Sequence, residues 1–184
     1  GKASAYEGGV RVPAIVRWPG VTQPGSTNDT PIITMDWFVT LVEAASLKPP
    51  PAASPTGAAG RDGLSLMPLL RGTGALPARD LFWHYPHHQH YQLGGATPYG
   101  AIRSGDFKLV EFFNDMHVEL YNLREGIGEQ RDLATSQPQK VAELDQRLTD
   151  YLAAVNAQMP NVNASVPVGQ RPPEKKGKKG KEKQ

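Results

Sequence analysis

The sequence predicts a chain in two parts, strand and helix segments first and then a small α+β subdomain. Three observations support this interpretation. An apolar run that ends at a Pro-Gly turn occupies residues 12–18. Short β-rich runs separated by polar gaps follow one another between residues 99 and 123. Apolar residues at steps of three and four then mark residues 138–157 as an amphipathic helix.

The first 72 residues contain the elements of the first part. Residues 12–18 predict a short buried strand that enters a turn. Asp36 is expected to be the N-cap of a helix of about three turns, because apolar residues follow it at helical spacing. Residues 48–63 are rich in proline and predict a surface loop. Residues 64–70 predict one or two helical turns that stop at Gly72.

The second part begins with an aromatic strand candidate at residues 81–85, followed by a polar loop. Three strand candidates come next, at residues 99–103, 107–113 and 116–123, and the short polar gaps between them indicate hairpins of an antiparallel meander. The helix should cover one side of this sheet and form with it an α+β unit with its own core. Five apolar residues share the helix face that would pack there: Val141, Leu144, Leu148, Leu152 and Val155.

The composition excludes several classes of functional site. The chain has 184 residues and no cysteine, which excludes disulfides, thiolate metal sites and a cysteine nucleophile within it. No apolar run approaches the roughly 18 residues of a membrane span, so none is predicted. The first residue is Gly1, and the plan of a signal peptide is missing, so we expect a processed chain or a fragment.

The net charge of +2 is unevenly distributed. Residues 171–184 hold seven basic and two acidic residues, which places a charge of +5 on the tail and −3 on the rest. The tail has almost no apolar residue to bury, so we expect residues 161–184 to be disordered. Lysines without interleaved aromatic residues would bind a polyanion nonspecifically and with strong salt dependence, and no specific nucleic-acid binding is expected.

The N-terminal segment carries the most informative motif. It resembles the sulfatase-family pattern Gly-Lys-(three residues)-Tyr-Glu-Gly-Gly-x-Arg-Val-Pro, which is followed by an apolar strand and Trp-Pro-Gly. Residues 34–41 and 63–70 resemble further segments of the family, and residues 101–109 and 119–133 look like the C-terminal subdomain of bacterial sulfatases. The fixed positions of the motif are all present: Gly1, Lys2, Tyr6, Glu7, Gly8, Gly9, Arg11, Val12 and Pro13.

The resemblance implies an alkaline-phosphatase-like α/β sulfatase fold. Residues 1–72 would be the C-terminal end of the catalytic α/β domain, and residues 73–160 the C-terminal α+β subdomain with its antiparallel sheet and packed helix. The strand and helices of residues 1–70 would lack their partner strands within this chain, so they should expose apolar surface.

The family's nucleophile is a formylglycine made from Cys or Ser in a Cys/Ser-x-Pro-x-Arg signature, and its divalent metal, Ca²⁺, is held by acidic residues. This chain has no such signature, since the proline after Ser65 comes three residues on rather than two. The resemblance therefore implies that the nucleophile and the metal ligands lie upstream of Gly1. This chain alone is expected to be inactive.

Lys2 is the catalytic candidate, since the family's lysine at this position reaches the sulfate group and helps to neutralise the oxygen that leaves. A compact ammonium suits a tetrahedral oxyanion, and stabilising developing charge accelerates such a step. Glu7, Gly8, Gly9 and Arg11 are expected to be structural at the edge of the active site. The glycines would allow a sharp turn, which Glu7 and Arg11 would hold by hydrogen bonds.

Four histidines, at positions 84, 87, 88 and 90, fall within seven residues. Such a group can ligate Zn or Cu, but a proline-interrupted loop without acidic neighbours offers little fixed geometry, and no metal ligand is assigned. Under the resemblance His84 or His88 would contact the organic part of the substrate, and the alternative is a loop histidine without a role. Arg103, Asp106 and Lys108 are expected to form a solvated strand edge and turn.

Two functions remain open at this point. The first is the C-terminal part of a sulfuric ester hydrolase that acts on a sulfate ester, for which a sulfated polysaccharide is one candidate. The alternative is a non-enzymatic α+β module with a basic tail that binds a polyanion. A periplasmic or extracellular location is implied by the resemblance alone, and the sequence leaves the substrate and the oligomeric state undecided.

Overall fold

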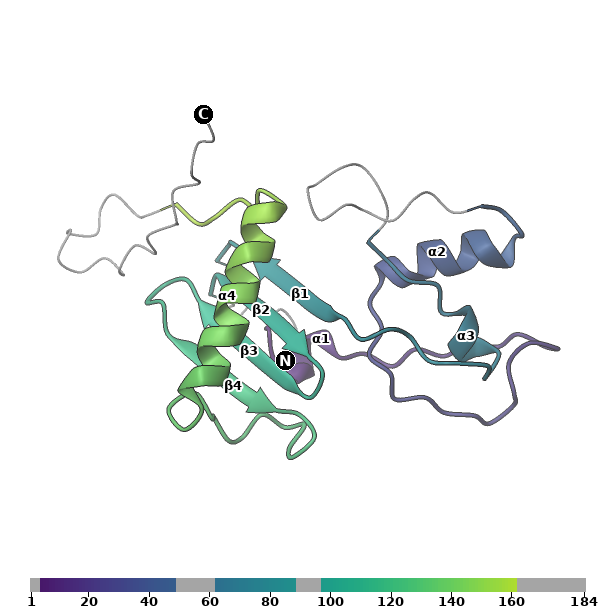
Figure 1. Cartoon of the computed structure of the whole chain (residues 1–184), viewed down its shortest axis with the longest axis horizontal. Helices are drawn as coiled ribbons and strands as arrows, with labels where there is room; N and C mark the ends of the chain where they lie inside the picture. Colours follow the sequence, from purple (N-terminus) through teal and green to yellow (C-terminus); the bar gives the residue numbers. More distant parts are fainter. Residues whose placement is uncertain (1–3, 49–61, 89–96, 162–184) are drawn as a thin grey trace.

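A computed structural model describes residues 4–48, 62–88 and 97–161 of the chain. These residues form two lobes (Figure 1). One is a four-stranded sheet crossed by helix α4 (Pro138–Ala154), and the smaller one contains helices α2 (Met35–Ala44) and α3 (Met67–Leu70). Within the described ranges, no helix is long and apolar enough to cross a membrane. Four predictions lie wholly or mainly outside the described residues, namely those for Lys2, for the proline-rich loop, for the polar loop that contains His90 and for the lysine-rich tail.

The sheet is antiparallel, with the strands in sequence order. It consists of β1 (Asp80–Tyr85), β2 (Tyr99–Ser104), β3 (Phe107–Phe112) and β4 (Val118–Asn122). The predicted meander is confirmed, and β1 extends it by pairing with β2 along its whole length. Gly105 takes a φ of 59° in the turn between β2 and β3, a conformation that glycine adopts without the steric cost of a Cβ.

Helix α4 (Pro138–Ala154) covers one face of the sheet, as predicted. The main core lies between them and contains eight buried residues: Ile102, Leu109, Phe113, Leu120, Leu133, Leu144, Leu148 and Leu152. Val141 packs at the edge of this core. Val155 is 52% exposed, so its predicted place on the packed face is wrong, because α4 ends at Ala154 and the chain turns away there.

The opposite face of the sheet is covered by the N-terminal segment (Figure 1). Ala5 is buried in a second cluster with residues of β2 and β3, and α1 (Glu7–Val10) follows as a single helical turn. Gly8 and Gly9 lie inside this turn without positive φ, so the sharp turn expected for them is not formed. Residues 4–11 thus pack on strands that are about 90 residues away along the chain. The domain division near residue 72 stays a prediction.

The second lobe is built from α2 (Met35–Ala44) and α3 (Met67–Leu70). Thr34 is the N-cap of α2, so the prediction for Asp36 is wrong by two positions. The Asp36 carboxylate instead accepts hydrogen bonds from the backbone amides of Ile33 and Leu64, both at 2.9 Å. It therefore joins the backbone just before the helix to the distant residue Leu64. Helix α3 ends before Gly72 as predicted.

Residues 12–18 form no strand, and the prediction that they are buried is wrong. Val12 is 75% exposed and Ile15 is 92% exposed. A strand needs a neighbour to pair with, and no strand of the described sheet is adjacent to this segment. Phe38 and Leu41 of α2 are also more than half exposed. The expectation that the first part exposes apolar surface is confirmed.

Candidate functional site

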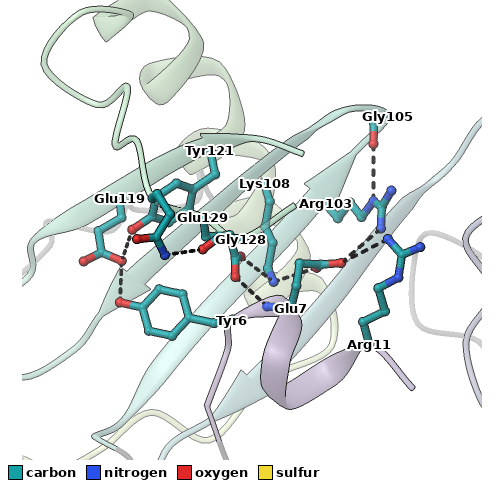
Figure 2. A network of polar contacts seen from close by, with 11 residues as sticks. Tyr6, Glu7, Arg11, Arg103, Gly105, Lys108, Glu119, Tyr121, Gly128 and Glu129 are labelled. Atoms are coloured by element: carbon teal, nitrogen blue, oxygen red, sulfur yellow. Dashed lines mark hydrogen bonds and ion pairs between the residues drawn. The ribbon is translucent and has the colours of Figure 1, made fainter. Parts of the chain in front are cut away.

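The candidate site is built from residues 4–11, which begin two positions after Lys2, and from the sheet face beneath them. Figure 2 shows the polar network between the two. Lys108 of β3 lies at its centre, with a fully buried side chain. Its Nζ is 2.9 Å from Oε1 of Glu7 and 3.0 Å from Oε1 of Glu129. The prediction that Lys108 lies on a solvated edge is wrong, because the N-terminal segment covers this central strand.

Glu7 is held by its backbone as well as by its side chain. Its N–H donates to Oε2 of Glu129 at 2.6 Å. Its Oε2 lies 3.7 Å from Nη1 of Arg103 and 3.9 Å from Nη1 of Arg11. The side chains of Glu7 and Arg11 thus meet only in a long ion pair and not in the expected hydrogen bonds, whereas the short contacts of Glu7 are to Lys108 and Glu129.

The charges in this network nearly balance. Lys108 and Arg103 face the carboxylates of Glu7 and Glu129, and all four side chains are buried or nearly so. A buried charge is tolerated only when opposite charges and hydrogen bonds replace the water that it loses. The four groups therefore depend on each other, and the position of Glu7 follows from that of its partners.

A second polar group lies beside the first on the same sheet face (Figure 2). The hydroxyls of Tyr6 and Tyr121 both donate to Oε2 of Glu119, at 2.7 Å and 3.0 Å. Burial, and then the neighbouring Glu119 carboxylate, hold the pKa of both tyrosines well above the usual range. Both phenols thus remain protonated hydrogen-bond donors at neutral pH. An open groove of about 820 Å³ runs between this segment and residues 127–130.

The structure does not bring His84 or His88 to this network. His84 lies on β1 with its ring against Phe113, on the sheet face that α4 covers. Its Nε2 is 2.8 Å from the carbonyl oxygen of Gln158, so a substrate contact through this atom would require that hydrogen bond to open. His88 follows the strand and is exposed.

No part of the described chain fits the metal that the resemblance implies. Over residues 4–48, 62–88 and 97–161, no group of three or more His, Asp or Glu side chains is arranged to hold an ion. The carboxylates of Glu7, within the motif, and of Glu129 are both committed to Lys108, and that of Glu119 accepts the hydroxyl of Tyr6.

Sequence reasoning missed Lys108 and Glu129 as members of the site. One signal was available for the lysine, since Lys108 alternates with Val110 and Phe112 on one face of the predicted strand. A lysine on an otherwise apolar strand face is either at an edge or buried with a carboxylate partner. No comparable signal marked Glu129, which lies in a loop after β4.

Comparison with known proteins identifies the family. The model for the C-terminal domain of N-sulphoglucosamine sulphohydrolase matches residues 1–158. A sulfatase from Formosa agariphila is 35% identical over 160 residues, which are 83% of this chain and 28% of that protein. Human arylsulfatase A is 39% identical over 113 residues, which are 61% of this chain and 20% of the relative. The chain spans less than a third of the length of these relatives.

Solved structures agree in fold. One that holds its substrate, D-glucosamine-2-N,6-O-disulfate, aligns with a TM-score of 0.58 at 25% identity and covers 79% of this chain and 29% of its own. A phosphonate monoester hydrolase from Silicibacter pomeroyi aligns with a TM-score of 0.53 at 23% identity, over 74% of this chain and 28% of its own. The predicted fold class is thereby confirmed. Because the family model covers most of its length, this chain belongs to the sulfatase family and corresponds to the family's C-terminal domain.

Proposed function

We propose that this chain is the C-terminal part of an enzyme that hydrolyses sulfate esters. The match of residues 1–158 to a sulfatase C-terminal domain carries the proposal. This match includes the motif as well as the sheet and helix α4, so it favours the enzyme over a free-standing module with a basic tail. Sulfated sugars are the favoured substrates, since an N-acetylglucosamine-6-O-sulfatase of Bacteroides thetaiotaomicron is 29% identical over 127 residues.

In this proposal Lys2 contacts the sulfate group and stabilises the charge that develops on the leaving oxygen. Such stabilisation acts in the transition state more than in the ground state, so it raises turnover rather than substrate affinity. Glu7, Gly8, Gly9 and Arg11 act as scaffold for the segment. The histidines at positions 84 and 88 remain candidates for contacts to the organic part of the substrate.

The nucleophile and the metal are proposed to come from a segment that precedes Gly1. A formylglycine would supply the nucleophile, and Ca²⁺ would supply positive charge at the sulfate group. Their placement upstream is supported by the length of the relatives, since the matched region is only 28% of the Formosa protein. The family resemblance also leads us to propose a periplasmic or extracellular location.

The proposal is tested with the full-length protein encoded by the gene. Wild-type enzyme should hydrolyse an aryl sulfate or a sulfated glucosamine, and Lys2→Ala should lower kcat by about two powers of ten, the usual scale for one charge-stabilising group. Lys140→Ala is the matched control and should keep wild-type kcat, because Lys140 pairs with Glu143 at the start of α4, on the opposite face of the sheet from the N-terminal segment. The chain of residues 1–184 alone should show no turnover. A loss of less than threefold in Lys2→Ala would show that Lys2 is only a neighbour of the reaction.

A further inference from the structure

We propose that Lys108 and Glu129 are positioning residues of the sulfatase site, because they clamp Glu7 and thereby fix the segment that carries Lys2. Lys2 precedes Glu7 by five residues, whereas Lys108 follows it by 101 and Glu129 by 122. The inference rests on the proposed function of Lys2. It assigns to the C-terminal sheet a part in catalysis that the catalytic motif does not itself reveal.

The clamp holds Glu7 by two hydrogen bonds. Lys108 Nζ donates to the side-chain Oε1 at 2.9 Å, and the backbone N–H of Glu7 donates to Oε2 of Glu129 at 2.6 Å. Charge-assisted hydrogen bonds are short and directional, so these two restrict both the side chain and the backbone of Glu7. The other carboxylate oxygen of Glu7 lies 3.7 Å from Nη1 of Arg103 and forms no hydrogen bond with the described residues. Glu129 itself takes a φ of 53°, a rare conformation for a residue with a Cβ, which the surrounding contacts must maintain.

The residues before Glu7 are fixed to other strands of the same sheet. Ala5 is 2% exposed and packs with Tyr99, Ala101 and Val110. Tyr6 donates its hydroxyl to Glu119 of β4. Three consecutive residues that follow Lys2 are therefore anchored to three strands, and the chain has little freedom to shift as a unit.

A purely structural contact would not need a buried lysine, because well-packed apolar residues are often as stable as a buried ion pair. What the ionic clamp adds is a defined geometry. Catalytic groups must be held to within about 0.5 Å of their productive position, and a misplacement of about 1 Å costs roughly a hundredfold in rate. A clamp on the catalytic segment is expected to serve this requirement.

The first test measures kinetics of the full-length enzyme. Lys108→Met should lower kcat by roughly 10- to 100-fold, with KM within about twofold of wild type. Lys140→Met is the matched control, since Lys140 pairs with Glu143 at the start of α4, on the opposite face of the sheet from Glu7, and should leave both parameters unchanged. In a Lys2→Ala background, Lys108→Met should cost less than about twofold, because a residue that acts through Lys2 has nothing left to position. If Lys108→Met lowers kcat in the Lys2→Ala background as much as it does in wild type, the proposal is overturned. Such a loss would come from general destabilisation, which does not depend on Lys2.

The second test measures hydrogen exchange in the 184-residue chain and does not depend on activity. Glu7→Met leaves the pair of Lys108 and Glu129 intact, so the sheet should keep its protection even if Lys108→Met fails to fold. Amides of residues 6–10 should exchange at least tenfold faster in this variant, whereas those of β3 should not change. Unchanged exchange in both segments would refute the clamp. An inactive wild-type enzyme would instead refute the proposed function, and exchange would still decide whether the clamp exists.

Discussion

The connection between the two lobes should depend on one buried ion pair. Arg79, which directly precedes β1, donates from Nη1 to Oδ1 of Asp36 at 2.6 Å and from Nη2 to the other carboxylate oxygen. The Asp36 side chain is fully buried and also accepts the amides of Ile33 and Leu64. Asp36→Asn would remove the charge and turn one acceptor into a donor that faces other donors.

The expected cost follows from burial. Breaking a buried ion pair by removing one partner costs about 3 to 5 kcal/mol. Arg79 keeps 18% of its side chain exposed, so water can hydrate part of its charge and the cost should lie near the lower end, at about 3 kcal/mol. This corresponds to roughly a hundredfold change in the equilibrium constant for opening of the α2 and α3 lobe.

Hydrogen exchange of the buried α2 amides at Val39 and Thr40 measures this opening. Asp36→Asn should accelerate it roughly a hundredfold, while amides of β3 change little. Asp106→Asn is the matched control, since Asp106 is 55% exposed and lies 3.9 Å from Arg124. Acceleration of less than threefold, or equal acceleration in β3, would refute the view that Asp36 joins the lobes locally.

The stabilisation by Asp36 should also depend on pH, in a direction that follows from the pKa of its carboxyl group. Burial alone would raise the pKa of Asp36, but the hydrogen bonds from Arg79, Ile33 and Leu64 outweigh it and hold the pKa below its usual value. The stabilisation is therefore complete above the ordinary pKa of about 3.9 and is lost as pH falls through the lower folded-state pKa. The difference between wild type and Asp36→Asn should be constant near neutral pH and shrink in acid.

Two further predictions concern the core and the exposed first part. Leu148→Ala, at a fully buried position of α4, should lower the free energy of unfolding by about 2 to 5 kcal/mol in urea titrations. Leu47→Ala, at a position that is 64% exposed, is the control and should change this free energy by less than about 0.5 kcal/mol. Equal effects of the two substitutions would contradict the packing described. In the isolated chain, amides of residues 107–123 should be far better protected than those of residues 12–18, and equal protection would contradict the assignment of the stable lobe.

The elements that the sequence predicts well are those whose signals are local. The hairpin between β2 and β3 rests on Gly105 and on strand alternation within about ten residues, and the structure has it as predicted. The packed face of α4 follows from spacing alone, with Leu144, Leu148 and Leu152 all buried. Both depend on interactions that the segment itself largely determines.

Residues 12–18 show that a local apolar pattern does not reveal whether a neighbouring strand is present. Their apolar run is typical of a strand that is buried on both faces, yet a strand also requires hydrogen-bond partners in a neighbouring chain segment. The four described strands pair with one another in one sheet that does not extend to this segment. The apolar side chains of Val12 and Ile15 therefore remain exposed.

Lys108 is a polar residue whose burial the local sequence pattern did not predict. Its strand was predicted, and its neighbours on the same face, Val110 and Phe112, are apolar, but burial of the lysine depends on a carboxylate that can reach it. The chain offers 18 acidic residues, and nothing in the local pattern of the strand selects Glu7, which lies 101 positions earlier. The motif that carries Lys2 thus contains the glutamate that makes a buried lysine tolerable in the distant sheet. Changes at Lys108 and at Glu7 should therefore be coupled, because the two charges stabilise each other at 2.9 Å, although Glu129 remains as a second partner of the lysine.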